Sequence, residues 1–358
     1  MKRLMEGSEA IVESAILAGC RFFAGYPMTP FTEVLENFAK KLPDVEGVCI
    51  NAESEIEAVN MVWGALSTGA RAATGSTGQG LALMQEAFSE ICRSELPLVV
   101  FNMARGQSEY FQCTRGGGHG DYRHIVLAPT DVEEAIELTQ LAFHLADKWR
   151  NPVQVYGDYY LAHQAESVEV KKYDFGELPS KPWVVDGAMG GTGQSKLITS
   201  IGSVKGEGTE PDMGAHLALI ADKYPPIAEA EQRAEEYMTD DADWIVVAFG
   251  TAARFVRPAV GQLRQMGVRV GMFRPITLWP FPERALKALA SQTRGVLVFE
   301  TNAGQMVDDV KIAVFGAAPV TSIGGLSADG SAFGLSPMLT VDEVTARIQA
   351  AVSEEVAV

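Results

Sequence analysis

Hydrophobic and polar positions alternate along residues 1–165 in a way that predicts buried strands separated by amphipathic helices. Short apolar runs, typical of strands buried on both faces, occur at Gly47 to Asn51, Leu96 to Met103, Ile125 to Ala128 and Pro152 to Tyr156. Apolar residues at helical spacing occupy Glu53 to Leu66, Gly80 to Cys92 and Asp131 to Ala146. Strands and helices in alternation predict a parallel sheet with right-handed crossovers.

A second α/β pattern begins at Trp244. It predicts strands and helices at Trp244 to Phe249, Ala252 to Met266, Val268 to Phe273, Pro282 to Ser291 and Gly295 to Phe299. Before it, from about Glu166 to Glu236, the periodicity weakens, and Gly, Pro and Ser gather at 187–193 and 202–213. We therefore expect a domain at 1–165, a connector at 166–236 and a second domain at 237–358. Parts of so long a connector should pack against a domain or a partner subunit.

Composition narrows the class of protein. Of the 358 residues, 47% are hydrophobic and 21% charged, which is typical of a soluble globular protein with a large core. No stretch reaches the roughly 18 uninterrupted apolar residues of a membrane helix, and Met1 to Glu9 is too polar for a signal peptide. The cytoplasm is the expected location.

Charge and cysteine content exclude several partners. With 29 Lys and Arg against 46 Asp and Glu, the formal charge of −17 should repel nucleic acid and anionic membranes. A few local arginines can still hold a small carboxylate substrate. The chain has four cysteines, Cys20, Cys49, Cys92 and Cys113, which form no C-x-x-C pair. We therefore expect them to be buried reduced thiols, and we expect any electron-transfer centre to lie in another chain.

The turn Gly25-Tyr-Pro-Met-Thr-Pro30 is the first candidate for chemistry. Two prolines restrict the backbone on either side of Thr29, and Gly25 permits a sharp turn. Such a rigid turn can present a hydroxyl and amide groups to an anion. Alternatively, Thr29 is only the N-cap of a helix from Phe31 to Lys40.

Glu55 is the second candidate. On a helix it lines up with Val59 and Val62, so its carboxylate points along an apolar face. A buried carboxylate without a partner costs several kcal/mol by order of magnitude, so Glu55 is either paired or functional. Buried acids are the groups that proton-handling sites use.

Two loops complete the candidates. Thr74-Gly-Ser-Thr-Gly-Gln-Gly80 precedes an apolar helix and is either a turn whose amides bind a cofactor or a turn packed closely against a neighbour. The loop from Arg105 to Arg123 follows a strand, where α/β folds place their sites. Its arginines could clamp a carboxylate, or the loop is a solvated interface. Apart from His119 in this loop, the histidines of the chain show no clustering.

These segments together resemble the alpha subunit of the 2-oxoacid:ferredoxin (acceptor) oxidoreductases, a resemblance that covers nearly the whole chain outside the connector. The matching residues are Gly7 to Ala10, Ala18 to Pro30, Glu53 to Ile56, Asn60 and Met61, Gly75 to Gly80, Leu83 to Glu86, Gly116 to Arg123, Phe273 to Pro282 and Glu300 to Met306. Several motifs in the right order are far more specific than any one of them.

The resemblance implies an α/β fold in which a parallel-sheet domain binds the pyrimidine ring of thiamine diphosphate and the second domain is similar to the C-terminal domain of transketolases. It implies that Glu55 hydrogen-bonds the ring nitrogen N1′ and so promotes the reactive ylid, and that Thr29 meets the substrate carboxylate. Arg105 is a further expected carboxylate partner. Tyr26, Pro27, Ser76 and Thr77 are expected to contact the cofactor.

The resemblance also implies partner chains. The Gly-Asp-Gly motif that binds magnesium and diphosphate is missing, since neither Gly120-Asp121 nor Gly157-Asp158 continues it. We therefore expect a beta subunit carrying that half of the site, with gamma and ferredoxin-like delta subunits, iron–sulfur clusters and Mg²⁺ outside this chain. The expected reaction converts a 2-oxoacid and coenzyme A to acyl-CoA and CO2. Its electrons go to ferredoxin or, through a flavin subunit, to NAD.

Two alternatives stay open. One is a component of a non-redox thiamine enzyme, and the other is a scaffold subunit without catalytic function. The glycine-rich loop with His119 and Asp121 resembles the branched-chain and aryl-oxoacid members more than the 2-oxoglutarate members.

Overall fold

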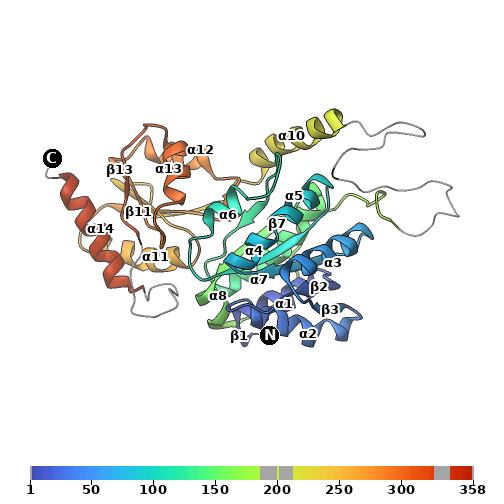
Figure 1. Ribbon diagram of the computed structural model, residues 1–358. Coiled ribbons are helices and arrows are strands. Elements are labelled where there is room, and N and C mark those ends of the chain that lie inside the picture. Colours follow the sequence, from blue (N-terminus) through green and yellow to red (C-terminus); the bar gives the residue numbers. More distant parts are fainter. Residues whose placement is uncertain (1, 186–199, 201–212, 326–338, 357–358) are drawn as a thin grey trace.

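The computed structural model describes residues 2–185, 200, 213–325 and 339–356. Two sheets, each covered by helices, lie side by side, with the N-terminus on the first unit and the C-terminus on the second (Figure 1). The Gly-rich stretches at 187–193 and 202–212 lie outside the described residues. The predicted α/β class is confirmed.

The first sheet has seven strands in the order β12-β6-β7-β5-β4-β2-β3, of which all but β12 run parallel. The strands are β2 (Phe22–Gly25), β3 (Val48–Asn51), β4 (Ala72–Ser76), β5 (Val99–Ala104), β6 (Ile125–Leu127), β7 (Val153–Asp158) and β12 (Thr277–Trp279). Because parallel strands share a direction, the carboxyl ends of β2, β3, β4 and β5 meet at one edge of the sheet.

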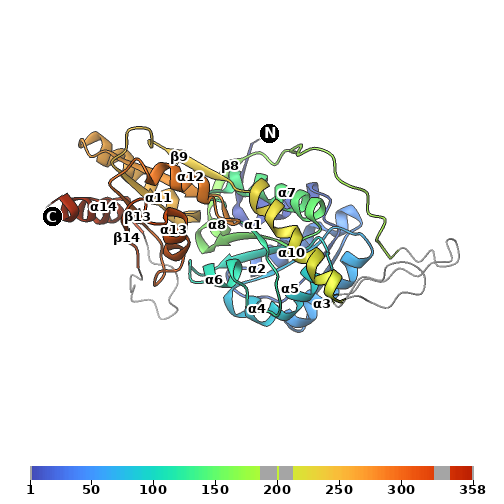
Figure 2. The same ribbon diagram turned by 90° about the horizontal axis from the view of Figure 1, so that it is seen from above.

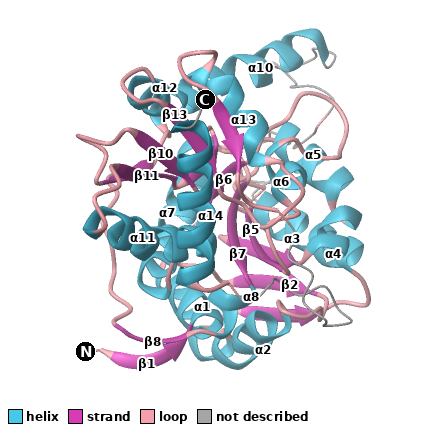
Figure 3. Ribbon diagram, turned by 90° about the vertical axis from the view of Figure 1, so that its left-hand side faces the viewer, coloured by secondary structure: helices cyan, strands magenta, loops and turns pink. Residues whose placement is uncertain are grey.

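Helices cover both faces of this sheet (Figure 3). One face carries α1, α2, α7 and α8, and the other carries α3, α4 and α5. Their bounds are α1 (Gly7–Leu17), α2 (Thr32–Lys41), α3 (Glu55–Ser67), α4 (Gly78–Leu83), α5 (Gln85–Arg93), α6 (Tyr110–Thr114), α7 (Val132–Trp149) and α8 (Tyr159–His163). Both layers are predominantly apolar inside, as expected for a parallel sheet buried on two sides.

Most predicted elements are present within three residues of the expected ends. Ser54 begins α3 by accepting a hydrogen bond from the Glu57 amide at 3.3 Å, and Asp131 begins α7 in the same way. Two predictions were wrong in detail. The helix expected from Gly80 to Cys92 is two helices that meet at Met84, and Thr74 to Ser76 close strand β4 instead of forming a turn.

The second sheet has five strands in the order β14-β13-β10-β11-β9, with α11 and α14 on one face and α12 and α13 on the other. The strands are β9 (Ala234–Tyr237), β10 (Trp244–Val247), β11 (Val270–Pro275), β13 (Gly295–Val298) and β14 (Val320–Ser322). The helices are α11 (Gly250–Gln265), α12 (Glu283–Ala290), α13 (Met306–Val314) and α14 (Val341–Val356).

The two units share a strand and a core. After β11 the chain returns to the first sheet, where β12 pairs antiparallel with β6. One hydrophobic cluster includes Tyr110 and Tyr156 of the first unit together with Phe249 and Phe273 of the second. The second unit is therefore packed directly against the end of the first sheet from which the loops after β5 and β6 emerge.

The described parts of the segment expected as a connector contain a strand and a helix that lie against the first unit. Strand β8 (Ala165–Val168) pairs with β1 (Arg3–Glu6), and helix α10 (Met213–Ala230) lies across the first unit (Figure 2). The Tyr224 hydroxyl of α10 lies 3.2 Å from the Cys92 thiol of α5. Pro225 and Pro226 inside α10 weaken its helical signal, so only tertiary contacts reveal it.

Candidate functional site

Four strand ends bring the predicted site residues to one edge of the first sheet. Gly25 of β2 is paired with Asn51 of β3, and Ser76 of β4 with Asn102 of β5. The turn at 26–30, the start of α3, the start of α4 and Arg105 follow these strands along the chain. The residues that the resemblance assigned to the cofactor and the substrate therefore lie at or beside this edge.

Glu55 is the first residue of α3 and is buried, with 3% of its surface exposed. Its Oε1 accepts a hydrogen bond from the Ser76 hydroxyl at 3.3 Å, the only side-chain partner of this carboxylate among the described residues. A single long bond from a neutral hydroxyl compensates a buried carboxylate poorly. The geometry thus leaves Glu55 able to accept a further hydrogen bond from a bound group.

Gly80 allows Glu55 and Ser76 to pack closely against the backbone of α4. A methyl group in place of its hydrogen would come within 2.3 Å of Glu55 Oε1 and 2.1 Å of Ser76 Oγ. Gly75 plays a different part, since a side chain there would meet the Phe101 carbonyl of β5 at 2.4 Å. The first glycine gives room to two polar side chains, whereas the second permits close strand packing. The place at the sheet edge where Glu55, Ser76, Thr77 and Gly80 lie is called the recess here.

Several buried polar atoms at this edge have no hydrogen-bond partner within the described residues. They include the Thr77 hydroxyl, the Asn102 side-chain carbonyl and the Gln112 side-chain carbonyl. Thr77 is completely buried and precedes α4, yet its hydroxyl caps no backbone amide of that helix. Buried polar groups in folded proteins are rarely left unpaired, so a cluster of them indicates a place where a polar ligand binds.

The rim of the recess is exposed and consists of the turn after β2 and the arginine after β5. Tyr26, Pro27 and Thr29 are exposed. Arg105 donates from Nε to the Thr29 carbonyl at 3.1 Å and from Nη1 to Gln79 Oε1 at 3.3 Å, so it joins this turn to α4. Helix α2 begins at Thr32 after Phe31, so the interpretation of Thr29 as its N-cap was wrong.

The arginines of the loop from Arg105 to Arg123 are not brought together. Arg115 donates to Asp309 of the second unit at 2.7 Å, and Arg123 donates to the Thr114 carbonyl at 3.4 Å. His119 lies against Arg93 of α5. Only Arg105 faces the recess, so a clamp of several arginines is absent from the described residues.

The sequence analysis missed Glu109, a half-buried acid beside the recess. Burial raises the pKa of Glu109 to about 7, against the opposing effects of the Tyr156 hydroxyl and the Arg105 charge. Its Oε2 lies 3.5 Å from the Tyr156 oxygen, and a side chain at Gly78 would meet its Oε1 at 2.7 Å. Its position in a loop after a parallel strand was the one available signal.

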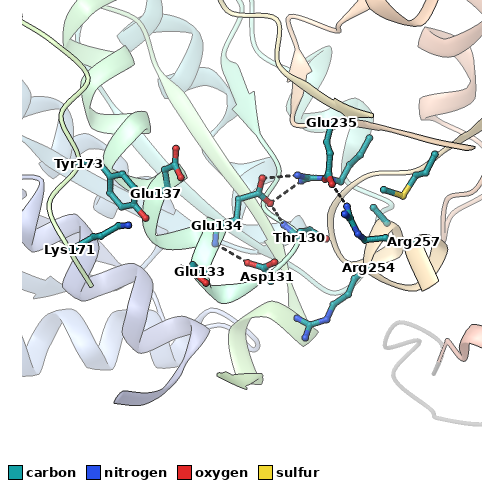
Figure 4. Close-up of a pocket in the computed structure, with 13 residues that line it drawn as sticks. Thr130, Asp131, Glu133, Glu134, Glu137, Lys171, Tyr173, Glu235, Arg254 and Arg257 are labelled. Carbon is teal, nitrogen blue, oxygen red and sulfur yellow. Dashed lines mark hydrogen bonds and ion pairs between the residues drawn. The ribbon is translucent and has the colours of Figure 1, made fainter. Parts of the chain in front are cut away.

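A hollow of about 570 Å³ lies away from this edge, between the start of α7 and the second unit (Figure 4). Its buried Arg274 donates to Glu134 at 2.8 and 2.9 Å and to Glu235 at 2.7 Å. Arg257 also pairs with Glu235. Because these charges satisfy one another, the hollow is better explained as an ion-paired joint between the units than as a ligand site.

The described residues show neither a metal cluster nor a membrane helix. In the part of the chain that the structure covers, no three His, Cys, Asp or Glu side chains lie close enough to hold an ion. Three of the four cysteines are buried free thiols, and Cys49 is half-buried. None of the helices in this part is both long and apolar enough to cross a bilayer.

Two family models match the chain. The model described as "Pyruvate flavodoxin/ferredoxin oxidoreductase, thiamine diP-bdg" matches residues 13–184. The model described as "Pyruvate:ferredoxin oxidoreductase core domain II" matches residues 242–334. The first includes the whole recess and its rim, and the second includes most of the five-stranded unit.

Curated relatives match over most of their length. The ketoisovalerate oxidoreductase subunit VorB of Methanothermobacter marburgensis is 38% identical over 321 residues, which are 87% of this chain and 89% of VorB. The 2-oxoglutarate synthase subunit KorA of Methanothermobacter thermautotrophicus is 36% identical over 346 residues, 88% of this chain and 92% of KorA. Nearly equal identities to proteins named for different 2-oxoacids leave the choice of substrate open.

Solved structures agree with this likeness. A 2-oxoglutarate:ferredoxin oxidoreductase from Magnetococcus marinus matches with a TM-score of 0.80 and 26% identity, covering 98% of this chain and 65% of that one. The chain therefore spans about two thirds of that protein's length. A split-gene transketolase matches with a TM-score of 0.60 and 15% identity, which shows a shared fold alone.

Proposed function

The chain belongs to the 2-oxoacid:ferredoxin oxidoreductase family as an alpha-type subunit, and from its site we propose that it forms one half of a thiamine-diphosphate centre. The proposed reaction is oxidative decarboxylation of a 2-oxoacid with coenzyme A to acyl-CoA and CO2. Its electrons pass to ferredoxin or another acceptor. The observation that carries this proposal is the buried Glu55 carboxylate, which accepts one long hydrogen bond and lies at the same strand ends as the unpaired Thr77 hydroxyl.

The recess fits the aminopyrimidine ring of thiamine diphosphate. Glu55 would hold a proton shared with the ring nitrogen N1′, and the unpaired Thr77 hydroxyl and Ser76 would contact the ring from β4. When bound, the cofactor supplies the electron sink that allows the bond to the carboxylate carbon of the substrate to break. Glu55 would supply a preorganised acceptor for the proton at N1′ from a buried position.

The exposed rim is suited to the substrate carboxylate and the outer part of the cofactor. Arg105 uses Nε and Nη1 to hold the turn and α4, which fixes its guanidinium group at the rim. We assign Arg105 and the Thr29 hydroxyl to the substrate carboxylate, because a guanidinium and a hydroxyl are good donors to such a group. Tyr26 and Pro27 would contact the cofactor beyond its pyrimidine ring.

Partner subunits would complete the centre. Four large apolar residues of the elements that carry the site are exposed to between 36% and 53%: Tyr26, Ile56, Met61 and Leu83. Exposed apolar residues of this kind favour an interface that a partner chain covers. We propose a beta subunit that binds Mg²⁺ and the diphosphate, with gamma and ferredoxin-like delta subunits carrying clusters and coenzyme A chemistry. A cytoplasmic location of the complex is part of the proposal.

The substrate is proposed to have an apolar side chain. The support is the glycine-rich loop with His119 and Asp121, together with the relative named for ketoisovalerate. In the described residues the rim offers Arg105 as the one cation directed at the recess. One cation serves one carboxylate, whereas a second carboxylate such as that of 2-oxoglutarate would need another donor.

The test is purification of the chain with its partners from the native host. Bound thiamine diphosphate and iron would be measured, followed by reduction of methyl viologen that requires coenzyme A, across ketoisovalerate, phenylglyoxylate, pyruvate and 2-oxoglutarate. We expect cofactor, clusters and dye reduction with an apolar 2-oxoacid. Decarboxylation without dye reduction would indicate a non-redox thiamine enzyme, and a complex without thiamine diphosphate would indicate a scaffold subunit.

A further inference from the structure

The segment from Arg105 to Arg115, called the site loop here, connects the recess to the second unit. It leaves β5 at the site edge and runs through α6. On one side Arg105 contacts the turn at Thr29, and Gln112 donates to the Gly78 carbonyl at the start of α4 at 3.0 Å. The loop thus holds both ends of the rim that faces the recess.

On its other side the site loop is held by residues 300–309, called the docking turn here. Gln107 is buried, and its Oε1 accepts from the Thr301 amide at 2.8 Å. Asn302 donates to the Gln107 carbonyl at 2.8 Å. The position of Gln107, two residues from Arg105, is therefore set from both its side chain and its backbone by the second unit.

Gln305 holds the middle of the site loop through both ends of its amide. Its Oε1 accepts from the Phe111 amide at 2.8 Å, and its Nε2 donates to the Ser108 carbonyl at 2.9 Å. Asp309 accepts from the Tyr110 hydroxyl at 2.5 Å and from Arg115 at 2.7 Å. Ser108 and Tyr110 flank Glu109, so these bonds also orient the acid beside the recess.

The docking turn is itself rigid. Glu300 is fully buried and accepts hydrogen bonds from three successive amides at the start of α13, those of Gln305, Met306 and Val307, at 3.1, 2.8 and 3.0 Å. This carboxylate fixes the backbone from which Gln305 projects. A rigid anchor can transmit position, whereas a mobile one cannot.

We propose that Gln305 is a positioning residue of the second unit, which holds the site loop so that Arg105 faces the substrate carboxylate. The inference rests on the proposed function, because it takes Arg105 as the group that binds this carboxylate. Gln305 touches neither the recess nor the rim, so it acts only through the loop. The second unit then serves the active site by placing one of its cations.

The test is Gln305→Ala in the assembled complex, with Gln292→Ala as the matched control. Gln292 is an exposed glutamine of the same unit, just beyond the end of α12, and its side-chain amide donates to the Ala288 carbonyl of that helix. Loss of both loop bonds should raise KM for the 2-oxoacid by about tenfold, since a misplacement near 1 Å can cost as much as about a hundredfold. KM for coenzyme A and the affinity for thiamine diphosphate should stay unchanged, as should all constants of the control.

A double-mutant comparison with Arg105→Ala separates the two hypotheses. If Arg105→Ala raises KM for the 2-oxoacid and Gln305→Ala adds nothing further in that background, Gln305 acts through Arg105. If Arg105→Ala has the effect and Gln305→Ala alone does not, the positioning role is wrong while the proposed function stands. If Arg105→Ala leaves KM for the 2-oxoacid unchanged, Arg105 does not bind the substrate carboxylate, and the proposal for Gln305 fails with its premise.

A second substitution guards against failure of assembly. Gln305→Glu keeps the acceptor for the Phe111 amide but replaces the donor to the Ser108 carbonyl with an oxygen. It should assemble and also raise KM for the 2-oxoacid, because the new oxygen would repel the Ser108 carbonyl. An unchanged KM in assembled Gln305→Glu and in assembled Gln305→Ala would overturn the proposal.

Discussion

Two buried glutamates, each close to the start of a helix, have opposite surroundings. Glu55 at the start of α3 is 3% exposed and receives one hydrogen bond, from the Ser76 hydroxyl at 3.3 Å. Glu300 before α13 is 0% exposed and receives three, from backbone amides between 2.8 and 3.1 Å. Both belong to segments that resemble the same family, so neither resemblance nor burial distinguishes them.

The difference in hydrogen bonding separates a ligand-binding acid from a structural one. Backbone amides at a helix start stabilise a carboxylate through charge-assisted bonds and the helix dipole, so Glu300 needs nothing from outside the chain. Glu55 keeps unused accepting capacity next to the unpaired Thr77 hydroxyl. Accordingly, substitutions should change activity at the first site and stability at the second.

The largest effect is expected for Glu55→Gln. The amide has nearly the same shape but lacks the charge that would hold the proton at N1′, so kcat of the complex should fall by about a thousandfold or more, roughly 4 kcal/mol of barrier. The melting temperature should stay within a few degrees of wild type, because no strong protein contact is lost. Turnover and thermal unfolding measure the two quantities.

Glu57→Gln is the matched control for this change. Glu57 lies two residues further along α3, is exposed, and accepts only from the Glu53 amide at 3.0 Å. It should retain near-normal turnover. Comparable activity in Glu55→Gln and Glu57→Gln would remove Glu55 from the proposed site.

The opposite result is expected for Glu300→Gln. Its amide nitrogen would face backbone N–H groups, and three charge-assisted bonds would be weakened or lost, so the free energy of unfolding should fall by about 3 kcal/mol. Denaturant unfolding measures this quantity, and Glu283→Gln in the exposed first turn of α12 should change it by less than about 0.5 kcal/mol. A fully stable but inactive Glu300→Gln would make the two glutamates alike.

The buried position of Glu55 and the parallel sheet could be predicted because both depend on local periodicity. Val59 and Val62 place Glu55 on the apolar face of α3 before any fold is known. Continuous apolar strands separated by amphipathic helices likewise predict a sheet covered on both faces. What these patterns cannot supply is the partner of each polar group.

The missed features all depend on contacts distant in sequence. Glu109 is enclosed by Tyr156, which lies 47 residues away, and by the start of α4. Strand β12 forms only because β6, some 150 residues earlier, offers an edge. The role of Asn302 and Gln305 in holding the site loop was invisible for the same reason, since their partners lie 195 and 197 residues away.

A smaller effect, on KM for the 2-oxoacid, is expected from the ionisation of Glu109. Its pKa of about 7 lies above the usual 4.5, so it loses its proton and becomes negative as pH rises through neutrality. That charge would compete with the substrate carboxylate for Arg105. Burial raises the pKa of the facing Tyr156 and Cys113, which stay neutral in this range. The Gly78 amide, which also faces Glu109, does not titrate.

KM for the 2-oxoacid should therefore rise by about fivefold between pH 6 and pH 8, equivalent to roughly 1 kcal/mol for one nearby charge in an intermediate dielectric. Glu109→Gln should flatten this profile near its low-pH value. Steady-state kinetics across this range on both proteins measure the effect. A profile that persists unchanged in Glu109→Gln would assign the titration to another group.

The smallest effect is expected for Thr77→Val, which removes an unpaired hydroxyl while preserving shape. Without a ligand the change should leave the free energy of unfolding equal or raise it by up to about 1 kcal/mol, because an unsatisfied polar atom is removed. Thr139→Val is the matched control, since Thr139 of α7 is equally buried and its hydroxyl also lacks a partner in the described residues.

Titration of thiamine diphosphate into the complex distinguishes the two variants. Thr77→Val should weaken cofactor binding by about fivefold, the value of one neutral hydrogen bond, whereas Thr139→Val should not change it. Equal cofactor affinity in both variants would mean that the Thr77 hydroxyl is unpaired for structural reasons, and that Glu55 alone marks the recess as a binding site.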